Sequence, residues 1–425
     1  MKTYLYPAKE AWDSLSRRPY VNNDNLDAIV KEIIASVRSG GDKALHVYSE
    51  RFDGAVIKEF KVSEAELNEA MKSVSDKIKE AIKTADENIE KFHRSQISEE
   101  AVVETMPGIK CWRKNVPVEK VGLYIPGGSA PLFSTVLMLA IPAKIAGCRE
   151  VIICTPPDKY GRIDPLIIYS AMMTGVTSIY KIGGAQAIAA IAYGTETIPK
   201  VYKIFGPGNQ YVTKAKEIVQ ADGVAIDMPA GPSEVLVIAD KNADPEFVAA
   251  DLLAQAEHGT DSQVVFLTDD KKMLIGVNRA VYEQLKRLPR KNIASAAFEN
   301  SFSLLLSSVM ECINFSNVYA PEHLIINTSD ASALAEKIIN AGSVFIGKYS
   351  CESAGDYASG TNHTLPTNGF ARSFSGVSVD SFIKKVTFQE LSHKGIERLG
   401  PTIEIMAEAE NLYGHKNAVS VRLKR

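Results

Sequence analysis

The chain has 425 residues, more than one hydrophobic core usually serves, so two or more packed units are expected. Hydrophobic residues make up 45% and charged residues 23%, which is the composition of an ordinary globular protein. The 48 Lys and Arg residues nearly balance the 51 Asp and Glu residues and leave a net charge of −3, which excludes a general electrostatic attraction for nucleic acid or an anionic membrane.

These properties favour a small-molecule ligand that is recognised by local charge. The first ten residues contain no apolar core of a signal peptide, and the longest apolar stretch, 132–145, is interrupted by Ser134, Thr135, Pro142 and Lys144. The five cysteines show no C-x-x-C spacing, which argues against a disulfide framework and against a thiolate zinc site. We therefore expect a cytoplasmic protein without a membrane span.

Residues 23–96 have a helical pattern. Ser63 and Glu66 form a capping box, in which the Ser63 hydroxyl satisfies an amide of the first turn and Glu66 reaches back. Apolar residues then recur at spacings of three and four, as on an amphipathic helix: Leu67, Met71, Val74, Ile78 and Ile82. We assign this region to packing and give it no chemistry.

From residue 117 to residue 240, short β-branched runs alternate with Ala-rich helical segments. The runs are 121–125, 150–154, 178–182 and 234–238. Continuous apolar strands separated by helices are typical of a parallel sheet that is covered on both faces. A second α/β stretch follows over 244–350, with strands at 263–267 and 343–346, and the tail from about Lys384 is mostly polar and is predicted to be helical.

Three predicted strands run into glycine turns, at 125–129, 182–186 and 205–209. A strand, a glycine turn and a helix together present backbone amides and a positive helix end to a phosphate. The G-x-G-x-x-G fingerprint is absent, because Tyr211 stands where its third glycine would be. On pattern alone, the turns suit either a nucleotide site or tight packing.

Residues 244–259 predict a helix that ends in a pair of metal-ligand side chains. Asp244 suits the N-cap and Gly259 the C-terminal stop. Gln255 and His258 are three residues apart, so both project from one face near the helix end. The pair could hold a metal ion, or it could be a polar last turn whose histidine caps the helix.

Two distant segments support the metal interpretation. The loop 353–363 is rich in small residues and carries one carboxylate, Asp356, and a helix near the C-terminus ends with Glu410 and His415. Together with the predicted helix pair, Asp356 and His415 would give a mixed shell of nitrogen and oxygen ligands suited to zinc, with open positions for a substrate.

Glu322 and His323 place a carboxylate beside an imidazole, directly after Pro321. Neighbouring side chains of an extended chain point in different directions, so we do not expect the two to act on one atom. They could serve two successive proton transfers, or the segment could be a surface turn.

Taken together, these segments resemble the histidinol dehydrogenase family over essentially the whole chain. The motifs that carry the resemblance are 122–128, 183–188, 206–209, 227–236, 255–258, 320–324, 355–363 and 407–410. The residues around His415, at 412–414 and 416–417, are not part of the family pattern, so the geometry of the tail is not predicted.

The resemblance implies a role for each matching residue. The implied zinc ligands are Gln255, His258, Asp356 and His415, with one Zn²⁺ per subunit. The implied acid/base pair is Glu322 and His323. The residues implied to hold NAD are Tyr124, Gln186 and Asn209. The residues implied to contact the substrate are Ser233, Gln255, His258, His323, Asp356, Glu410 and His415.

The resemblance also implies a fold and an activity. The expected fold is α/β, with two Rossmann-like, aldehyde-dehydrogenase-like parallel-sheet domains, helical N- and C-terminal extensions and an intertwined homodimer whose subunits share active sites. The expected parts are an N-terminal extension (1–22), a first α/β domain (23–116 with 241–380), an NAD-binding second domain (117–240) and a dimerisation segment (381–425). The implied reaction oxidises L-histidinol through L-histidinal to L-histidine with two NAD and one water, the final step of histidine biosynthesis.

Three alternatives stay open at this point. A metal-free aldehyde or alcohol dehydrogenase would share an α/β core and use Gln255 and His258 only structurally. A non-catalytic protein derived from the enzyme would have lost site residues, yet all of them are present. A relative could instead oxidise another amino alcohol, such as a sulfonate-bearing one, although the acidic Glu410 suits the ammonium group of histidinol.

Overall fold

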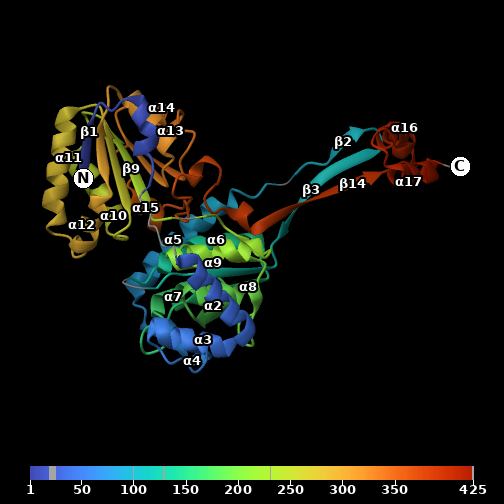
Figure 1. Cartoon of the computed structure of the whole chain (residues 1–425), viewed down its shortest axis with the longest axis horizontal. Coiled ribbons are helices and arrows are strands. Elements are labelled where there is room, and N and C mark those ends of the chain that lie inside the picture. The colour runs from blue at the N-terminus through green and yellow to red at the C-terminus, as the bar shows by residue number, and fades with distance from the viewer. Residues whose placement is uncertain (19–24, 99, 128–129, 230, 424–425) are drawn as a thin grey trace.

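The computed structural model describes residues 1–18, 25–98, 100–127, 130–229 and 231–423. Figure 1 shows two packed α/β bodies beside each other and a thin arm that extends away from them and ends in two helices. Two parallel sheets form the bodies and an antiparallel sheet forms the arm. The predicted α/β fold with parallel sheets is therefore confirmed.

The six-stranded sheet lies in the first body. Its strands in spatial order are β1 (Lys2–Leu5), β11 (Phe302–Leu305), β10 (Gln263–Thr268), β9 (Glu234–Ala239), β12 (His323–Asn327) and β13 (Ser343–Ile346). Every neighbouring pair is parallel, and β9, β10 and β12 are buried along their whole length. This is why their sequences are continuously apolar instead of alternating. Six helices follow these strands: α10 (Pro245–Ala256), α11 (Lys271–Leu285), α12 (Lys291–Glu299), α13 (Val309–Tyr319), α14 (Ala331–Ala335) and α15 (Glu352–Tyr357).

The five-stranded sheet lies in the second body. Its strands in spatial order are β6 (Ser178–Lys181), β5 (Glu150–Thr155), β4 (Lys120–Tyr124), β7 (Lys203–Phe205) and β8 (Ala225–Ile226). All pairs are parallel, and the strand order reverses between β4 and β7. In open α/β sheets, ligands bind at such a reversal, outside the carboxyl ends of the strands. The helices of this sheet are α6 (Phe133–Ala146), α7 (Pro165–Met173), α8 (Gly184–Tyr193) and α9 (Gln210–Ala221).

The long helices between residues 26 and 94 pack against the helices of the five-stranded sheet. Helix α2 (Leu26–Gly40) contacts α8 and α9, α4 (Glu64–Ser73) contacts α7, and α5 (Asp76–Arg94) contacts α6. The expected division placed residues 23–116 with residues 241–380, and its limits remain a prediction. The remaining short elements are α1 (Trp12–Leu15), α3 (Asp42–Tyr48), η1 (Lys9–Ala11), η2 (Ser49–Asp53), η3 (Phe370–Arg372) and η4 (Val379–Phe382).

The apolar residues that recur from Leu67 to Ile82 are divided between two helices, α4 and α5. The capping box of Ser63 and Glu66 is present at the start of α4. Val74, however, has an extended backbone, with ψ of 127°, and ends α4, while Ser75 precedes a new helix. The apolar spacing continues across this break because Val74 at the end of α4 and Ile82 on α5 are both buried, although Ile78 between them is exposed. Spacing alone therefore does not reveal the break. Within the described residues, no helix has the length and apolar character needed to cross a membrane.

The arm is an antiparallel ribbon of β2 (Val103–Met106), β3 (Ile109–Pro117) and β14 (Ile383–Leu391), followed by α16 (His393–Ala409) and α17 (Tyr413–Leu423). The prediction of a helical tail from Lys384 is therefore wrong up to Leu391. All nine residues of β14 pair with β3, from Ile383 opposite Pro117 to Leu391 opposite Ile109. This strand is polar because both faces of the ribbon are largely exposed, so it lacks the apolar alternation that would predict it.

Candidate active site

A short connection joins the two parallel sheets, and several of the predicted site residues lie near it. Residues 227–233 run from the carboxyl end of β8 to the amino end of β9. Ser233 and Glu234 stand at the start of β9, and His323 stands at the start of β12, in register with Val235. The carboxyl edge of the five-stranded sheet is thereby tied to the amino edge of the six-stranded sheet.

Helix α10 forms as its sequence predicts, except at its end. The Asp244 carboxylate accepts a hydrogen bond from the Glu246 backbone N–H, and Pro245 occupies the first turn. The helix ends at Ala256, earlier than the predicted Gly259, so His258 lies in the turn that follows. Gln255 is fully buried on the last helical turn, whereas His258 is exposed.

Three side chains form a cluster with the geometry of a metal site. One ligand atom from each of His258, Glu352 and Asp356 lies within 4.8 Å of the other two. Glu352 and Asp356 are four residues apart on α15, so they share one helix face. An imidazole nitrogen and carboxylate oxygens at this separation are a donor set suited to zinc. The structure thus brings together His258 and Asp356 as expected and adds Glu352, which was not predicted.

Gln255 reaches the same cluster through Glu352. With its amide nitrogen turned toward Glu352, Gln255 donates to Glu352 Oε1 and its oxygen accepts from the Glu234 backbone N–H at 3.2 Å. A role as a metal ligand would require the opposite orientation, with the amide oxygen directed at the cluster. Both orientations keep the Gln255 amide beside the Glu352 carboxylate, which belongs to the cluster.

Glu322 and His323 point into one region, contrary to the sequence expectation. Their closest side-chain atoms, Glu322 Oε2 and His323 Nδ1, are 3.6 Å apart, and both side chains are buried. The alternation of an extended strand does not apply because β12 begins only at His323. His323 Nε2 lies 3.5 Å from Asp356 Oδ1, which connects the pair to the metal-type cluster.

The backbone of Glu234 holds both members of this pair. Its N–H donates to Glu322 Oε2 at 2.8 Å, and its carbonyl oxygen lies 3.3 Å from His323 Nδ1. A carbonyl oxygen can only accept, so Nδ1 carries the proton and Nε2 is left toward Asp356. The first strand residue of β9 therefore fixes the orientation of the imidazole.

The electrostatics of the cluster follow from burial and crowding of charge. Burial raises the pKa of Glu352 well above its usual range. Burial also opposes ionisation of His323, but the carboxylates of Glu352 and Glu322 outweigh it and raise the pKa of His323. Burial works against ionisation of Asp356 as well, yet the His323 imidazole holds the pKa of Asp356 below its usual range. Several acidic groups around one imidazole form a site that a cation stabilises.

The predicted dinucleotide residues lie at the carboxyl edge of the five-stranded sheet. Tyr124 ends β4, and its hydroxyl accepts a hydrogen bond from the Gly184 backbone N–H at 3.1 Å. Gln186 lies in the first turn of α8, and its buried Nε2 has no hydrogen-bond partner among the described residues. Asn209 caps α9 by accepting from the backbone N–H groups of Tyr211 and Val212. The edge thus offers a helix N-terminus and an unsatisfied amide donor at the sheet reversal.

A buried ion pair fixes the glycine turn at this edge. Lys216 on α9 pairs with the Asp227 carboxylate and also donates to the Gly206 carbonyl oxygen at 3.0 Å. The second Asp227 oxygen accepts from the Gly206 N–H at 2.8 Å. Gly206 has φ of +119°, and a Cβ there would collide with the Tyr124 carbonyl oxygen, so this turn requires glycine.

Replacing Lys216 with Met is expected to lower the free energy of unfolding by about 3 to 5 kcal/mol, because it removes the ammonium group that pairs directly with the buried Asp227 carboxylate. Urea unfolding followed by circular dichroism measures this loss. The double variant Lys216→Met/Asp227→Asn, which removes both charges, should recover part of it. A loss below about 1 kcal/mol, the value of a surface pair, would contradict the assignment.

Glu410 and His415 are not part of this cluster within the chain. Glu410 follows α16 and His415 lies on α17, at the far end of the arm from α10 and α15 (Figure 1). The contacts that α17 makes are mainly with α16. A fourth ligand from His415 therefore cannot come from the arm of the same chain in this conformation.

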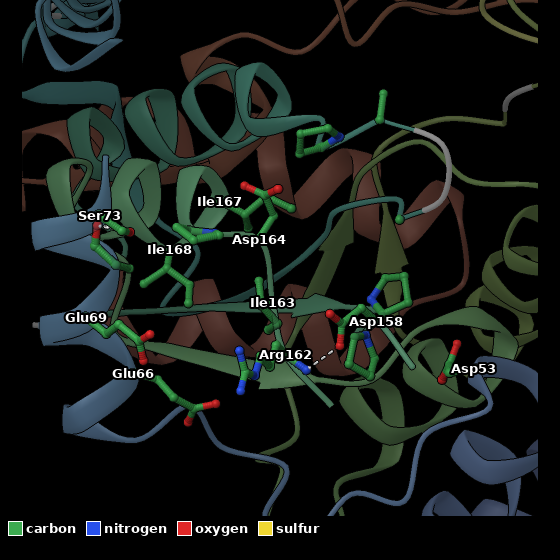
Figure 2. A pocket seen from close by; sticks show the side chains of 17 residues that line it. Asp53, Glu66, Glu69, Ser73, Asp158, Arg162, Ile163, Asp164, Ile167 and Ile168 are labelled. Atoms are coloured by element: carbon green, nitrogen blue, oxygen red, sulfur yellow. Dashed lines mark hydrogen bonds between the residues drawn. The ribbon is translucent and has the colours of Figure 1, made fainter. Parts of the chain in front are cut away.

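A cavity of about 740 Å³ lies apart from these residues, between α4, α7 and the loop after β5 (Figure 2). Gly127 and Pro156 line it, so it adjoins the carboxyl edge of the five-stranded sheet. Its charged lining is acidic apart from one arginine: Asp53, Glu66, Glu69, Asp158, Asp164 and Arg162. Such a lining disfavours phosphate, and none of the predicted site residues faces it.

Sequence reasoning missed Glu352 and Glu234, and a signal existed for each. Glu352 precedes Asp356 by one helical turn, the spacing that places two carboxylates on one face. Glu234 is a charged residue at the head of a strand that is otherwise continuously apolar. A buried carboxylate in such a position needs a partner, which points to a special role.

The fold and the site define a class: a parallel α/β protein with a potential metal centre at a sheet edge, beside an adjacent acid/base pair and a dinucleotide-type glycine turn. The profile of the histidinol dehydrogenase family matches residues 16–423. The chain belongs to this family.

Close relatives agree over the full length. The chain is 57% identical to the histidinol dehydrogenase of Bacteroides thetaiotaomicron over 423 residues, which covers 100% of this chain and 99% of the relative. It is 52% identical to that of Mannheimia succiniciproducens, covering 95% of this chain and 92% of the relative. The crystal structure of histidinol dehydrogenase from Elizabethkingia anophelis, at 57% identity, superposes with a TM-score of 0.97 and covers 100% of this chain and 98% of that one.

Proposed function

We propose that the chain is a zinc-containing, NAD-dependent L-histidinol dehydrogenase of histidine biosynthesis. It oxidises L-histidinol through L-histidinal to L-histidine with two NAD and one water. The observation that carries the proposal is the cluster of His258, Glu352 and Asp356 beside Glu322 and His323, in a chain that belongs to this family from residue 16 to residue 423. All five cysteines are free, as in a cytoplasmic enzyme, and none is needed as a nucleophile.

The residues that would hold zinc are Gln255, His258 and Asp356, with His415 supplied by a partner subunit. The donor set fits, because the His258 imidazole and the Asp356 carboxylate converge, and Glu352, which lies in the same cluster, contacts the Gln255 amide. When bound, zinc would hold the imidazole and amine of histidinol and so orient the alcohol. Ser233 at the head of β9 and Glu410 from the partner would complete the contacts to the substrate.

The acid/base pair would serve the two oxidations in turn. His323 presents Nε2 to the site because Nδ1 faces the Glu234 carbonyl oxygen. A bound cation would offset the carboxylates that raise the pKa of His323, and the neutral Nε2 would then take the alcohol proton as hydride leaves for nicotinamide. Glu322 has one oxygen held by the Glu234 N–H, and its carboxylate would activate water for attack on the aldehyde. General-base assistance of this kind is worth about 10² to 10⁴ in rate.

NAD would lie on the carboxyl edge of the five-stranded sheet. Asn209 keeps the N-terminus of α9 capped, and Gln186 offers an unsatisfied buried amide donor. The Tyr124 hydroxyl oxygen accepts a hydrogen bond from the Gly184 N–H, and its O–H could donate to a ligand. The short 227–233 connection would bring nicotinamide toward the acid/base pair.

The arm supports a homodimer with shared sites. His415 and Glu410 lie far from their own cluster, and helices α16 and α17 expose apolar side chains such as Ile405, Met406 and Tyr413. A second copy that receives this arm would cover them and gain the two site residues. The sites would then be reciprocal, as two-fold symmetry requires.

Release of two NADH per L-histidinol consumed, abolished by a chelator and restored by zinc, is the expected result with the purified protein. Absorbance at the NADH band and product analysis measure it. Full activity after verified metal removal would favour a metal-free dehydrogenase. Oxidation of a sulfonate-bearing amino alcohol in preference to histidinol would favour the related enzyme that differs in substrate.

A further inference from the structure

Arg18, in the N-terminal segment, lies beside the active site, and each nitrogen of its guanidinium donates a hydrogen bond within the protein. Arg18 is only 10% exposed at its side chain, and Glu234, its ion-pair partner, is 1% exposed. Two of its five N–H donors, on Nε and Nη2, reach Glu234 Oε2 at 2.7 and 2.6 Å. A buried pair of this kind is costly to form, so its position is informative.

The remaining donors bind the backbone that leads into the acid/base pair. Nη1 donates to the carbonyl oxygens of Ser16 and Tyr319 at 2.9 and 2.7 Å, and Nη2 donates to that of Ala320 at 3.3 Å. The guanidinium also lies 3.5 Å from the centre of the Tyr319 ring. Ala320 has φ of +54°, a strained conformation for a residue with a side chain, so this turn needs outside support.

Glu234 is the other end of the same link. Its second carboxylate oxygen accepts from the backbone N–H of Asn368, while its own N–H and carbonyl hold Glu322 and His323. Arg18 therefore binds two segments that lead into the site. It holds β9 through the Glu234 side chain, and it holds the turn before β12 through the carbonyl oxygens of Tyr319 and Ala320. The positions of both predicted catalytic side chains depend on these two backbones.

Resting on the function proposed above, we propose that Arg18 is a positioning residue which, through Glu234 and the 319–320 turn, sets the geometry of Glu322 and His323 for both oxidation steps. Lysine cannot replace it, because an ammonium has three donors that diverge, against five in a planar fork. The hydrogen bonds of Arg18 go to Ser16, Glu234, Tyr319 and Ala320, none of which is proposed to hold NAD or zinc. The proposed zinc ligand Gln255 meets Glu234 only at its backbone N–H, not at the carboxylate that Arg18 binds.

The variant Arg18→Met is expected to lower kcat about 10- to 100-fold in both half-reactions, with an unchanged KM for NAD and unchanged zinc content. Arg18→Lys, which keeps the charge, should have a kcat about 10-fold below that of the wild type. Added methylguanidinium should restore part of the activity of Arg18→Ala. Glu234→Gln breaks the same link. The double variant Arg18→Met/Glu234→Gln should therefore lose no more kcat than the single variant with the lower kcat.

The matched control is Trp12→Leu. Trp12 lies in the same N-terminal segment and packs against Phe315, without contact to Glu234. It should lower thermal stability while leaving kcat within about 2-fold of the wild type, since it removes packing alone. A kcat loss in Trp12→Leu equal to that in Arg18→Met, at equal loss of stability, would overturn the positioning role. So would an Arg18→Lys enzyme with wild-type kcat.

A crystal structure of Arg18→Met, or of Arg18→Lys if the Met variant does not fold, tests the link independently of activity. Displacement of the Glu322 and His323 side chains by about 1 Å or more is expected, the scale at which rates fall 10²-fold. Unmoved side chains would refute the inference even if the wild type oxidised histidinol. A wild type inactive on histidinol, with displaced side chains in the variant, would refute the proposed substrate and leave the link intact.

Discussion

His258→Ala and His415→Ala chains, each inactive as a homodimer, are expected to regain about a quarter of the wild-type activity when mixed in equal amounts. With random exchange, about half of the dimers are hybrids, and one of the two sites in each hybrid has both histidines. The physical reason is that His258 lies in the cluster with Asp356, whereas His415 lies at the end of the arm. Initial rates of NADH release after subunit exchange measure the recovery.

Two controls make this test decisive. Chains that carry different affinity tags prove that hybrids have formed, and hybrids isolated through both tags should have about half the activity per dimer of the wild type. His393→Ala removes an exposed histidine of α16 and should leave the homodimer active. Inactive hybrids after proven exchange would rule out a site that is shared between subunits.

Glu322→Gln is expected to slow oxidation of the aldehyde by about 10² to 10⁴, and to slow alcohol oxidation far less. Glutamine keeps an oxygen that can accept from the Glu234 N–H, so the local structure is retained, but it cannot take a proton from water. Single-turnover assays that start from L-histidinol and from L-histidinal separate the two steps.

The matched substitution is Glu311→Gln, in the first turn of α13 and outside the cluster. It should leave both half-reactions unchanged. Comparable losses from Glu322→Gln in the two steps would contradict the division of labour with His323, and would assign Glu322 a part in binding or orientation instead.

Local signals in the sequence predicted much of the fold. The capping box at Ser63 and the N-cap at Asp244 are confirmed, because each depends on residues within one turn. The continuously apolar runs became buried parallel strands, since a strand covered on both faces needs no polar side. The ribbon strand β14 was missed for the opposite reason: its partners lie in β3, more than 260 positions earlier, and its surface faces outward.

The sequence predicted some residues of the site but not others. His258 and Asp356 could be paired because each stands in a polar segment of unusual composition. Arg18 carries no such signal, since an arginine near a chain end is an ordinary surface residue until tertiary packing buries it. The four-residue spacing between Glu352 and Asp356 places both on one helix face, but it does not show that the face is buried beside His258. The roles of Arg18 and Glu352 depend on which distant backbones the fold brings beside them, and local pattern does not encode that.

The projecting ribbon has a consequence for the time before two chains meet. In a single chain, Ile405 and Met406 are largely exposed on the arm, and Phe388 is partly exposed although it stacks on Trp112. In the intertwined dimer proposed above, these groups find cover only in a second copy, so pairing is the last stage of folding instead of a later docking of finished units. In that dimer, newly made chains would either pair or self-aggregate, and dilution would slow the pairing.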